Sequence, residues 1–306
     1  MRCNSEHLEK FKSEARQIIA SFVEKLKEPP PIIYHYTSDV GLKGILDTGE
    51  VWPTDIFNLN DPSELRHGLS QAIDILKGKL ANSPLQSKKF VGDLVTLFEQ
   101  GGIPGFGHFF ICSFSACGDD LGQWRAYGDD GRGYALGFDA KVLEDGFIRS
   151  PNTEAFYITY DDGKLDTLLD QIIESYRGTL DIDLTLQSGV SVDEMALLYT
   201  WLTVYLLRAA VFFKHGAYAN EKEYRFLEFY GADVQPPDVK HRARRYSLIR
   251  YRRFDWRSVA IGPLKEIVAG PAAHRRNASQ FARDCLQLYH AGAVPIVYSA
   301  IPYRAG

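Results

Sequence analysis

The sequence has few cysteines, and their positions indicate neither a disulfide framework nor a zinc site. The four cysteines among its 306 residues form no CxxC pair, and they stand at Cys3, Cys112, Cys117 and Cys285. A chain of this length can bury a core without cross-links, so we expect free thiols in a reducing cytoplasm. The histidines also lack the close spacing of metal ligands, and we predict no metal.

Several catalytic signatures are missing as well. The sequence contains no HExxH, GxSxG or Walker loop, which argues against zinc proteases, α/β-hydrolases and P-loop enzymes. Gly131, Gly133 and Gly137 do not form a dinucleotide-binding fingerprint, because their spacing is off by one and they precede a predicted strand. The charged N-terminus lacks the apolar core of a signal peptide.

Only one stretch approaches the length of a membrane span. Residues 195–213 carry Arg208 as their only charge, but Thr200, Thr203 and Tyr205 dilute the run. We therefore predict a buried core helix and no membrane partner.

The remaining composition is that of an ordinary globular protein. Hydrophobic residues make up 45% and charged residues 24%, and the net charge of −4 names no partner. An amphipathic helix is predicted for residues 5–28, within an N-terminal segment 1–30 that ends in a run of prolines. Residues 31–306 alternate strands and helices without a regular βαβ order. They predict a single α+β domain of mixed, mainly antiparallel sheets with flanking helices, and the expected strands include Ser258–Ile261.

Three short polar stretches stand where strands are expected to begin or end. The first contains His35 and Thr37 on one strand face and Tyr34 and Tyr36 on the other. Such a histidine can hydrogen-bond a ribose while a ring stacks on a base. A half-buried strand whose histidine is satisfied by a backbone carbonyl explains the same pattern.

The second and third stretches carry paired hydroxyls and paired carboxylates. Ser113 and Ser115 share a strand face, which suits a ligand site or simply a strand end. Glu221 and Glu223 share a face if the strand starts there. A fixed carboxylate stabilises the oxocarbenium-like centre formed when an N-glycosidic bond breaks. A solvated charged turn is the alternative interpretation.

Two further segments have polar and aromatic residues together. A cluster precedes a glycine-rich turn and consists of Asp120, Gln123, Trp124, Arg125 and Tyr127. It is typical of ligand sites, although cation–π packing also explains it. Residues 240–253 contain seven Lys or Arg and no acid. This stripe indicates either phosphate contacts or a solvated edge strand.

Taken together, these segments resemble the family called domain of unknown function 2971. The resemblance rests on YHYTS, LNDPSE, SFSACGDDLGQWRAYGDDGRGYALGF, FKHGAYANEKEYRF and the final SAIPYR, and it runs from about residue 32 to 304. The family name implies no reaction.

The order of a histidine strand, an S-x-S strand and an E-x-E strand also resembles the ADP-ribosyltransferase superfamily, which implies that fold and NAD as the substrate. By this resemblance His35 holds the ribose, Tyr36 or Tyr127 stacks on nicotinamide, and Ser113 and Ser115 support the pocket. The catalytic carboxylate is Glu223, and Glu221 orients the acceptor. Phe114 stands where threonine is usual, and the histidine and E-x-E motifs belong to different subclasses.

The resemblance implies an ADP-ribosyltransferase or, with water as acceptor, an NAD glycohydrolase. A role as a toxin or in phage defence, a protein or nucleic-acid acceptor and an antitoxin partner are also implied. One alternative is a non-catalytic module that binds nucleotides or nucleic acid. Another is a metal-dependent nuclease using Asp61, Glu64, Glu221 and Glu223.

Overall fold

The computed structural model describes most of the chain, and the account below is restricted to those residues. They are 6–26, 28–59, 63–80, 92, 96, 107–149, 152–180, 192–231, 234–259, 262–289 and 292–305.

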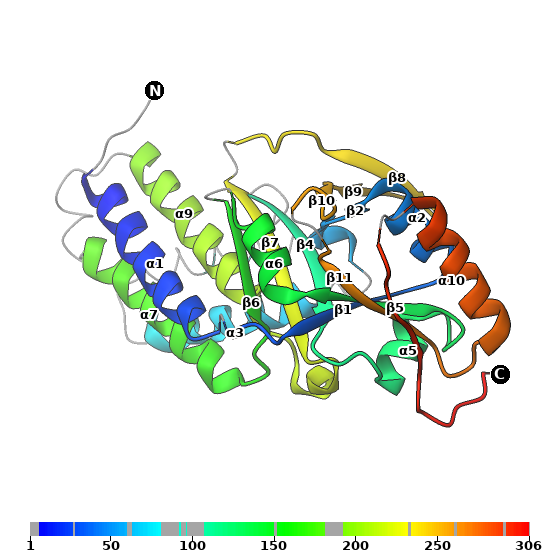
Figure 1. Cartoon of the computed structure of the whole chain (residues 1–306). Helices are drawn as coiled ribbons and strands as arrows, with labels where there is room; N and C mark the ends of the chain where they lie inside the picture. The colour runs from blue at the N-terminus through cyan, green and yellow to red at the C-terminus, as the bar shows by residue number, and fades with distance from the viewer. Residues whose placement is uncertain are drawn as a thin grey trace.

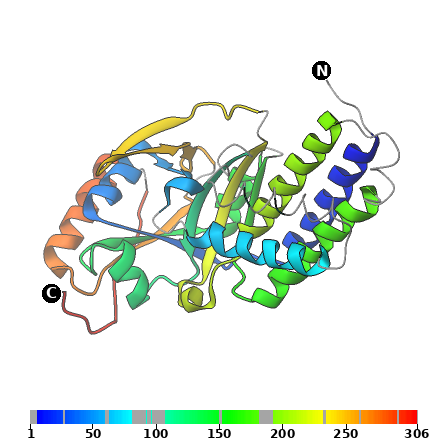
Figure 2. The same ribbon diagram turned by 180° about the vertical axis from the view of Figure 1, so that it is seen from behind.

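Most helices gather at the two ends of the molecule, with a sheet between them, and α6 lies over the middle of the sheet (Figure 1). One group contains α1 (Glu6–Glu24), α3 (Ser63–Leu80), α7 (Asp162–Leu180) and α9 (Val192–Ala210), and α3 is best seen from behind (Figure 2). The remaining helices are α2 (Asp39–Thr48), α5 (Leu121–Tyr127), α6 (Ala140–Phe147) and α10 (Arg275–Tyr289), with 3₁₀ turns η1 (Ile56–Asn58) and η3 (Gly216–Glu221).

Ten of the described strands form one mixed sheet. Their bounds are β1 (Ile32–Thr37), β3 (Thr54–Asp55), β4 (Gly107–Ser115), β5 (Tyr134–Asp139), β6 (Thr153–Tyr157), β7 (Glu223–Gly231), β8 (Lys240–Arg244), β9 (Ser247–Tyr251), β11 (Leu264–Ala269) and β12 (Ile296–Tyr298). The short strands β2 (Glu50–Val51) and β10 (Phe254–Asp255) pair separately. All ladders are antiparallel except β11 with β12, so the predicted α+β class with a mainly antiparallel sheet is confirmed.

Strand β4 is the branch point of this sheet. Along one edge it pairs with β7 over its whole length. Its other partners are β3, opposite Phe110 and Ile111, and β1, opposite Ser115. Residues 112–114 therefore lie between the two arms, one formed by β3, β9 and β8 and the other by β1, β5, β11 and β12.

Two large hydrophobic cores cover opposite faces of the sheet, and a smaller one lies around Tyr36 and Trp124. Phe109, Ile111 and Leu227 pack with α1, α3, α7 and α9. Phe114 and Phe226 point to the opposite face and pack with α2, α6 and α10. The alternation along β4 and β7 follows from the period of two in a strand.

The predicted N-terminal helix spans Glu6–Glu24, and its apolar side is buried. Phe11 is fully buried between the edges of Tyr176 and Tyr205. The stretch around 195–213 forms α9, whose Leu202 and Leu206 belong to the same core. In the described part of the chain, no helix is long and apolar enough to cross a membrane.

The strand predicted for Ser258–Ile261 is wrong at Ser258 and Val259, which lie in a turn, and residues 260–261 lie outside the described part. The Asp255 carboxylate accepts hydrogen bonds from the backbone N–H groups of Arg257 and Ser258, both at 3.0 Å. A side chain that captures backbone donors in this way favours a turn over a strand.

Candidate functional site

The second and third polar stretches meet on the β4–β7 ladder. Ser115 lies opposite Glu223, and Ser113 lies opposite Arg225. Cross-strand partners share a face, so both serines and both charged residues point to the side of the sheet covered by α9. The Ser113 Oγ donates a hydrogen bond of 2.6 Å to Glu223 Oε1.

Two buried cations hold the same carboxylate. Arg225 Nε donates to Glu223 Oε1 at 2.7 Å. Lys214 Nζ lies 3.4 Å from Glu223 Oε2 and 2.6 Å from Glu221 Oε2. We call Ser113, Lys214, Glu221, Glu223 and Arg225 the Glu223 cluster.

These neighbours keep Glu223 ionised. Burial alone would raise the pKa of this carboxyl, but the charges of Arg225 and Lys214 outweigh burial. With the hydrogen bonds from Arg225 and Ser113, they lower the pKa of Glu223 to about 2. Glu223 is therefore a fixed anion at neutral pH.

The structure does not place Glu221 on the same strand as Glu223, as the spacing of the two residues had indicated. Strand β7 begins at Glu223, whereas Glu221 ends η3. Lys222, between them, has a left-handed backbone with φ of 45°, so the two glutamates do not share a strand face. Their common ion-pair partner, Lys214, brings the carboxylates together.

The backbone around Glu223 is also fixed. The Glu223 N–H donates to Tyr160 Oη at 3.0 Å, and the Ser115 Oγ donates to the Glu221 carbonyl at 2.7 Å. Burial, with the nearby charges of Glu223 and Glu221, raises the pKa of Tyr160 to about 12. Its phenol therefore remains protonated. The segments on both sides of Lys222 are thus tied to neighbouring elements.

Ser113 connects the cluster to solvent. It is exposed, although its neighbours Cys112 and Phe114 are buried and its strand is paired with β7. The opening coincides with the interval between the β3 and β1 ladders. Solvent therefore reaches the sheet directly beside the buried Glu223.

His35 lies next to this opening but on the other sheet face. It pairs with Leu136, and its ring contacts the edge of Phe114 at 5.8 Å between centroids. Its Nδ1 lies 3.3 Å from the Ser113 carbonyl. A carbonyl only accepts, so Nδ1 carries the proton in this contact. Burial and the charge of Arg242 lower the pKa of His35 despite the bond to Ser113, which favours a neutral ring with a free lone pair on Nε2.

The predicted separation of faces within the first stretch is confirmed, because Tyr34 pairs with Ser115 while His35 pairs with Leu136. Thr37 packs against α2, where a Cβ at Gly41 would lie 1.8 Å from its Oγ1. Glycine is needed at that position to allow this close approach.

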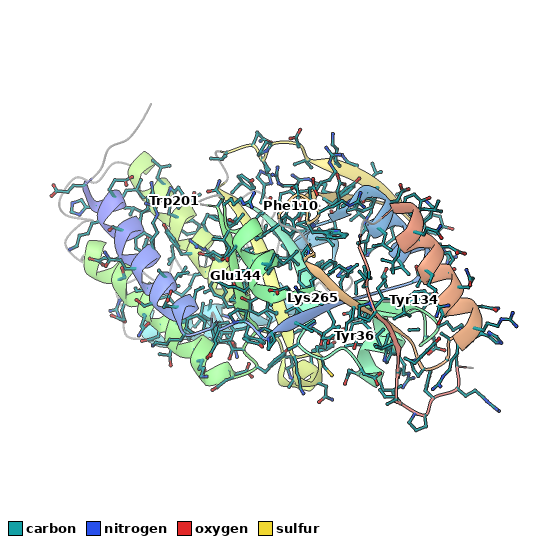
Figure 3. The ribbon with its side chains drawn as sticks, in the orientation of Figure 1. Tyr36, Phe110, Tyr134, Glu144, Trp201 and Lys265 are labelled. Atoms are coloured by element: carbon teal, nitrogen blue, oxygen red, sulfur yellow. The ribbon has the colours of Figure 1, made fainter. Side chains whose placement is uncertain are left out.

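Tyr36 and Trp124 are buried against each other, with centroids 4.7 Å apart. Tyr36, labelled near α5 in Figure 3, donates through Oη to the Cys117 carbonyl at 2.8 Å and accepts from the Asp120 N–H at 3.1 Å. Trp124 Nε1 donates to Asp119 Oδ1 at 2.8 Å. These contacts fix α5 on the sheet and leave neither ring open to a ligand.

Helix α5 nevertheless borders the cluster. It packs beside η3, which carries Glu221. Gln123 is buried, whereas Arg125 and Tyr127 are exposed. Asp120 is half-buried, and its carboxylate caps α5 by accepting from the Gln123 N–H at 2.9 Å. Arg125 and Tyr127 are therefore the most exposed members of the predicted polar and aromatic cluster.

The sequence pattern did not indicate Lys214 or Tyr160 as site residues. Lys214 belongs to the segment FKHGAYANEKEYRF, but it lies outside regular structure, and its partners Glu221 and Glu223 stand on either side of the left-handed Lys222. Among the described residues, no group of three or more His, Cys, Asp or Glu side chains is arranged to hold a metal ion. Asp61 and the side chain of Glu64 lie outside the described residues.

Comparison with known proteins gives one match. A family model described as protein of unknown function (DUF2971) matches residues 123–226, so this part of the chain is similar to that family. The matched segment contains Lys214, Glu221, Glu223 and Arg225 but neither serine nor His35. Neither the curated proteins nor the solved structures gave a match.

Proposed function

We propose that this protein cleaves the N-glycosidic bond between nicotinamide and ribose in NAD, as an ADP-ribosyltransferase or an NAD glycohydrolase. The observation that supports this most directly is the ionised Glu223, held by Ser113 and Arg225 beside a solvent-exposed point of the sheet. An ADP-ribosyltransferase-like fold is part of the same proposal.

The chemistry follows from where charge develops. Departure of neutral nicotinamide leaves positive charge shared between the ribose C1′ and ring oxygen. A carboxylate held in place stabilises that charge without reorganising. The Oε1 atom of Glu223 accepts hydrogen bonds from Ser113 and Arg225. The Oε2 atom of Glu223 has only Lys214, at 3.4 Å, and Lys214 lies closer to Glu221. We therefore assign Glu223 Oε2 to the sugar.

The remaining residues receive roles in the same proposal. Ser113 holds Glu223. His35 lies on the sheet face opposite Glu223, so its Nε2 accepts a ribose hydroxyl only from a sugar that spans the opening at Ser113. Because Tyr36 is buried, stacking on nicotinamide falls to the exposed Tyr127, with Arg125 nearby for a phosphate. Glu221 orients the acceptor, which is a protein, a nucleic acid or water. A toxin or phage-defence role in the cytoplasm, with an antitoxin, belongs to the same proposal.

The test is nicotinamide release from NAD by the purified chain. Glu223→Gln keeps the shape and removes the charge, and we expect it to lower the rate by about 10²- to 10³-fold. Glu228→Gln is the matched control, because Glu228 is a buried glutamate of the same strand and pairs with Arg252.

Equal rates for the two variants would overturn the assignment of Glu223. Absence of release by the wild type, with no NAD-dependent rise in Tm, would overturn the proposal as a whole. Circular dichroism of both variants checks that each is folded.

A further inference from the structure

The hairpin of β8 and β9 forms a strongly basic edge of the molecule. All five residues of β8 are exposed, and β8 ends the order of strands in the sheet (Figure 1). We call residues 240–251 the basic hairpin. Together with the next two residues they include seven Lys or Arg and no acid, although the whole chain is net negative.

Six of these seven positive charges divide into two sets, and the seventh, Arg244, donates a hydrogen bond to the Asn58 carbonyl at 3.2 Å. The first set forms ion pairs near the base of the hairpin. Arg250 pairs with Asp55 at 3.0 Å. Arg252 and Arg253, which directly follow the hairpin, pair with Glu228 and with Glu50, the latter at 3.3 Å. In the part of the chain that the structure describes, no carboxylate pairs with Lys240, Arg242 or Arg245. An anionic ligand would supply the negative charge that these three cations lack among the described residues.

An exposed aromatic ring stands at the tip. Tyr246 is 96% exposed, and its backbone is left-handed with φ of 62°. This conformation is unfavourable for a bulky residue, and turns normally place Gly or Asn there. The Arg245 guanidinium lies 5.6 Å from the ring centroid.

A second aromatic group positions a cation on the hairpin. Trp52 stacks on Tyr251 with centroids 4.5 Å apart, and the Arg242 guanidinium lies 5.8 Å from the Trp52 ring. Charged edge strands commonly prevent aggregation. That role does not require a tyrosine held in a strained turn beside an arginine, so a ligand with both negative charge and flat rings fits better.

We propose that the basic hairpin binds single-stranded nucleic acid. Lys240, Arg242 and Arg245 contact phosphates, and a base stacks on Tyr246. A single strand is specified because a base must leave its own stack to lie on a protein ring. This surface uses no member of the Glu223 cluster, so the inference does not depend on NAD cleavage.

Fluorescence anisotropy with a labelled oligo-dT and a labelled oligo-U of equal length tests the proposal on the full chain. Three phosphate contacts predict a slope of log K against log salt of about −2. We expect Lys240→Ala/Arg242→Ala/Arg245→Ala to weaken binding more than tenfold and bring the slope close to zero. The control replaces three exposed arginines elsewhere by alanine, Arg276, Arg283 and Arg304, and should bind as the wild type does.

Tyr246→Asn separates recognition from folding. Asparagine tolerates the left-handed turn, so we expect an unchanged or higher Tm together with about tenfold weaker binding. Tyr246→Phe keeps the ring and should bind as the wild type does.

Three results would overturn the proposal. They are no saturable binding of either oligonucleotide at low salt, equal loss of affinity in the control triple variant, and equally tight binding of a duplex or of polyglutamate. The last outcome would instead indicate a general polyanion surface.

Discussion

Strand β7 carries two buried glutamates that each pair with an arginine, and the pKa values of these two carboxyls shift in opposite directions. Glu223 is the first residue of the strand, and Arg225 and Lys214 lower its pKa to about 2. Glu228 lies further along the same strand, where burial raises its pKa and the pairing with Arg252 only partly offsets the effect of burial. The same residue type on one strand is thus held ionised at Glu223 and made easier to protonate at Glu228.

The number of partners explains this difference. Glu223 has two cations and the Ser113 hydroxyl. In the Glu228–Arg252 pair, the buried Arg252 Nη1 has no hydrogen-bond partner among the described residues, so that pair is imperfectly satisfied. An ion pair alone therefore does not indicate a site, whereas a buried carboxylate surrounded by several donors and next to solvent does.

The largest expected effect comes from removing each carboxylate. Glu223→Ala leaves Arg225 and Lys214 buried without their shared anion, and we expect a loss of about 3–5 kcal/mol in the free energy of unfolding. Glu228→Ala should cost less, about 1–3 kcal/mol, because its burial already opposes ionisation. Urea unfolding measures the loss of stability in both variants. An equal loss, or a larger loss for Glu228→Ala, would contradict the difference proposed between the two glutamates.

Acidification should change the stabilising contributions of the two glutamates in opposite directions. Glu223 has a folded pKa of about 2, below the ordinary value of 4.5 for a glutamate, so it contributes about 3 kcal/mol above pH 4.5, which is lost as the pH falls towards 2. Glu228 has a raised folded pKa, so its contribution is present below pH 4.5 and falls as the pH rises through the folded pKa.

The measurement is Tm against pH for the wild type, Glu223→Gln and Glu228→Gln. The difference between wild type and Glu223→Gln should narrow from pH 6 to pH 3, while the difference for Glu228→Gln shifts in favour of the wild type. Parallel curves for all three proteins would contradict both pKa directions.

The smallest expected effects are those of the two serines. Ser113→Ala removes a hydrogen bond to a charged group at a solvent-exposed position, which we expect to cost about 1.5 kcal/mol and to raise the pKa of Glu223. Ser115→Ala removes the donation to the Glu221 carbonyl and the acceptance from the Cys117 N–H, and should cost about 1 kcal/mol for each of these neutral bonds. Denaturant titration at pH 7 measures both losses, and unchanged stability of Ser113→Ala would show that Ser113 is unimportant to Glu223.

The sequence was sufficient to predict most of the longer strands and the facing serines, because alternation with a period of two determines which side chains share a face. The two-residue strands β2, β3 and β10 were not predicted. The contacts of Lys214 could not be predicted from the sequence, because they depend on where α9 ends and on the left-handed backbone of Lys222. For His35, the sequence predicted only that its side chain points away from the side on which Tyr34 and Tyr36 lie. Its separation from Glu223 depends on the β1–β4 register at Tyr34 and Ser115, a long-range property that no local pattern carries.

The branched pairing of β4 has a consequence for synthesis. Ser113 and Glu223 are 110 residues apart, so at about 5–20 residues per second the β7 edge of β4 waits roughly 5–20 s for its partner. During that interval an apolar strand containing Phe109, Phe110 and Ile111 has one long edge unpaired, which is a hazard for aggregation. The nascent chain thus carries its serines well before the carboxylate they face, and we expect the ribosome-bound protein to need protection by a chaperone.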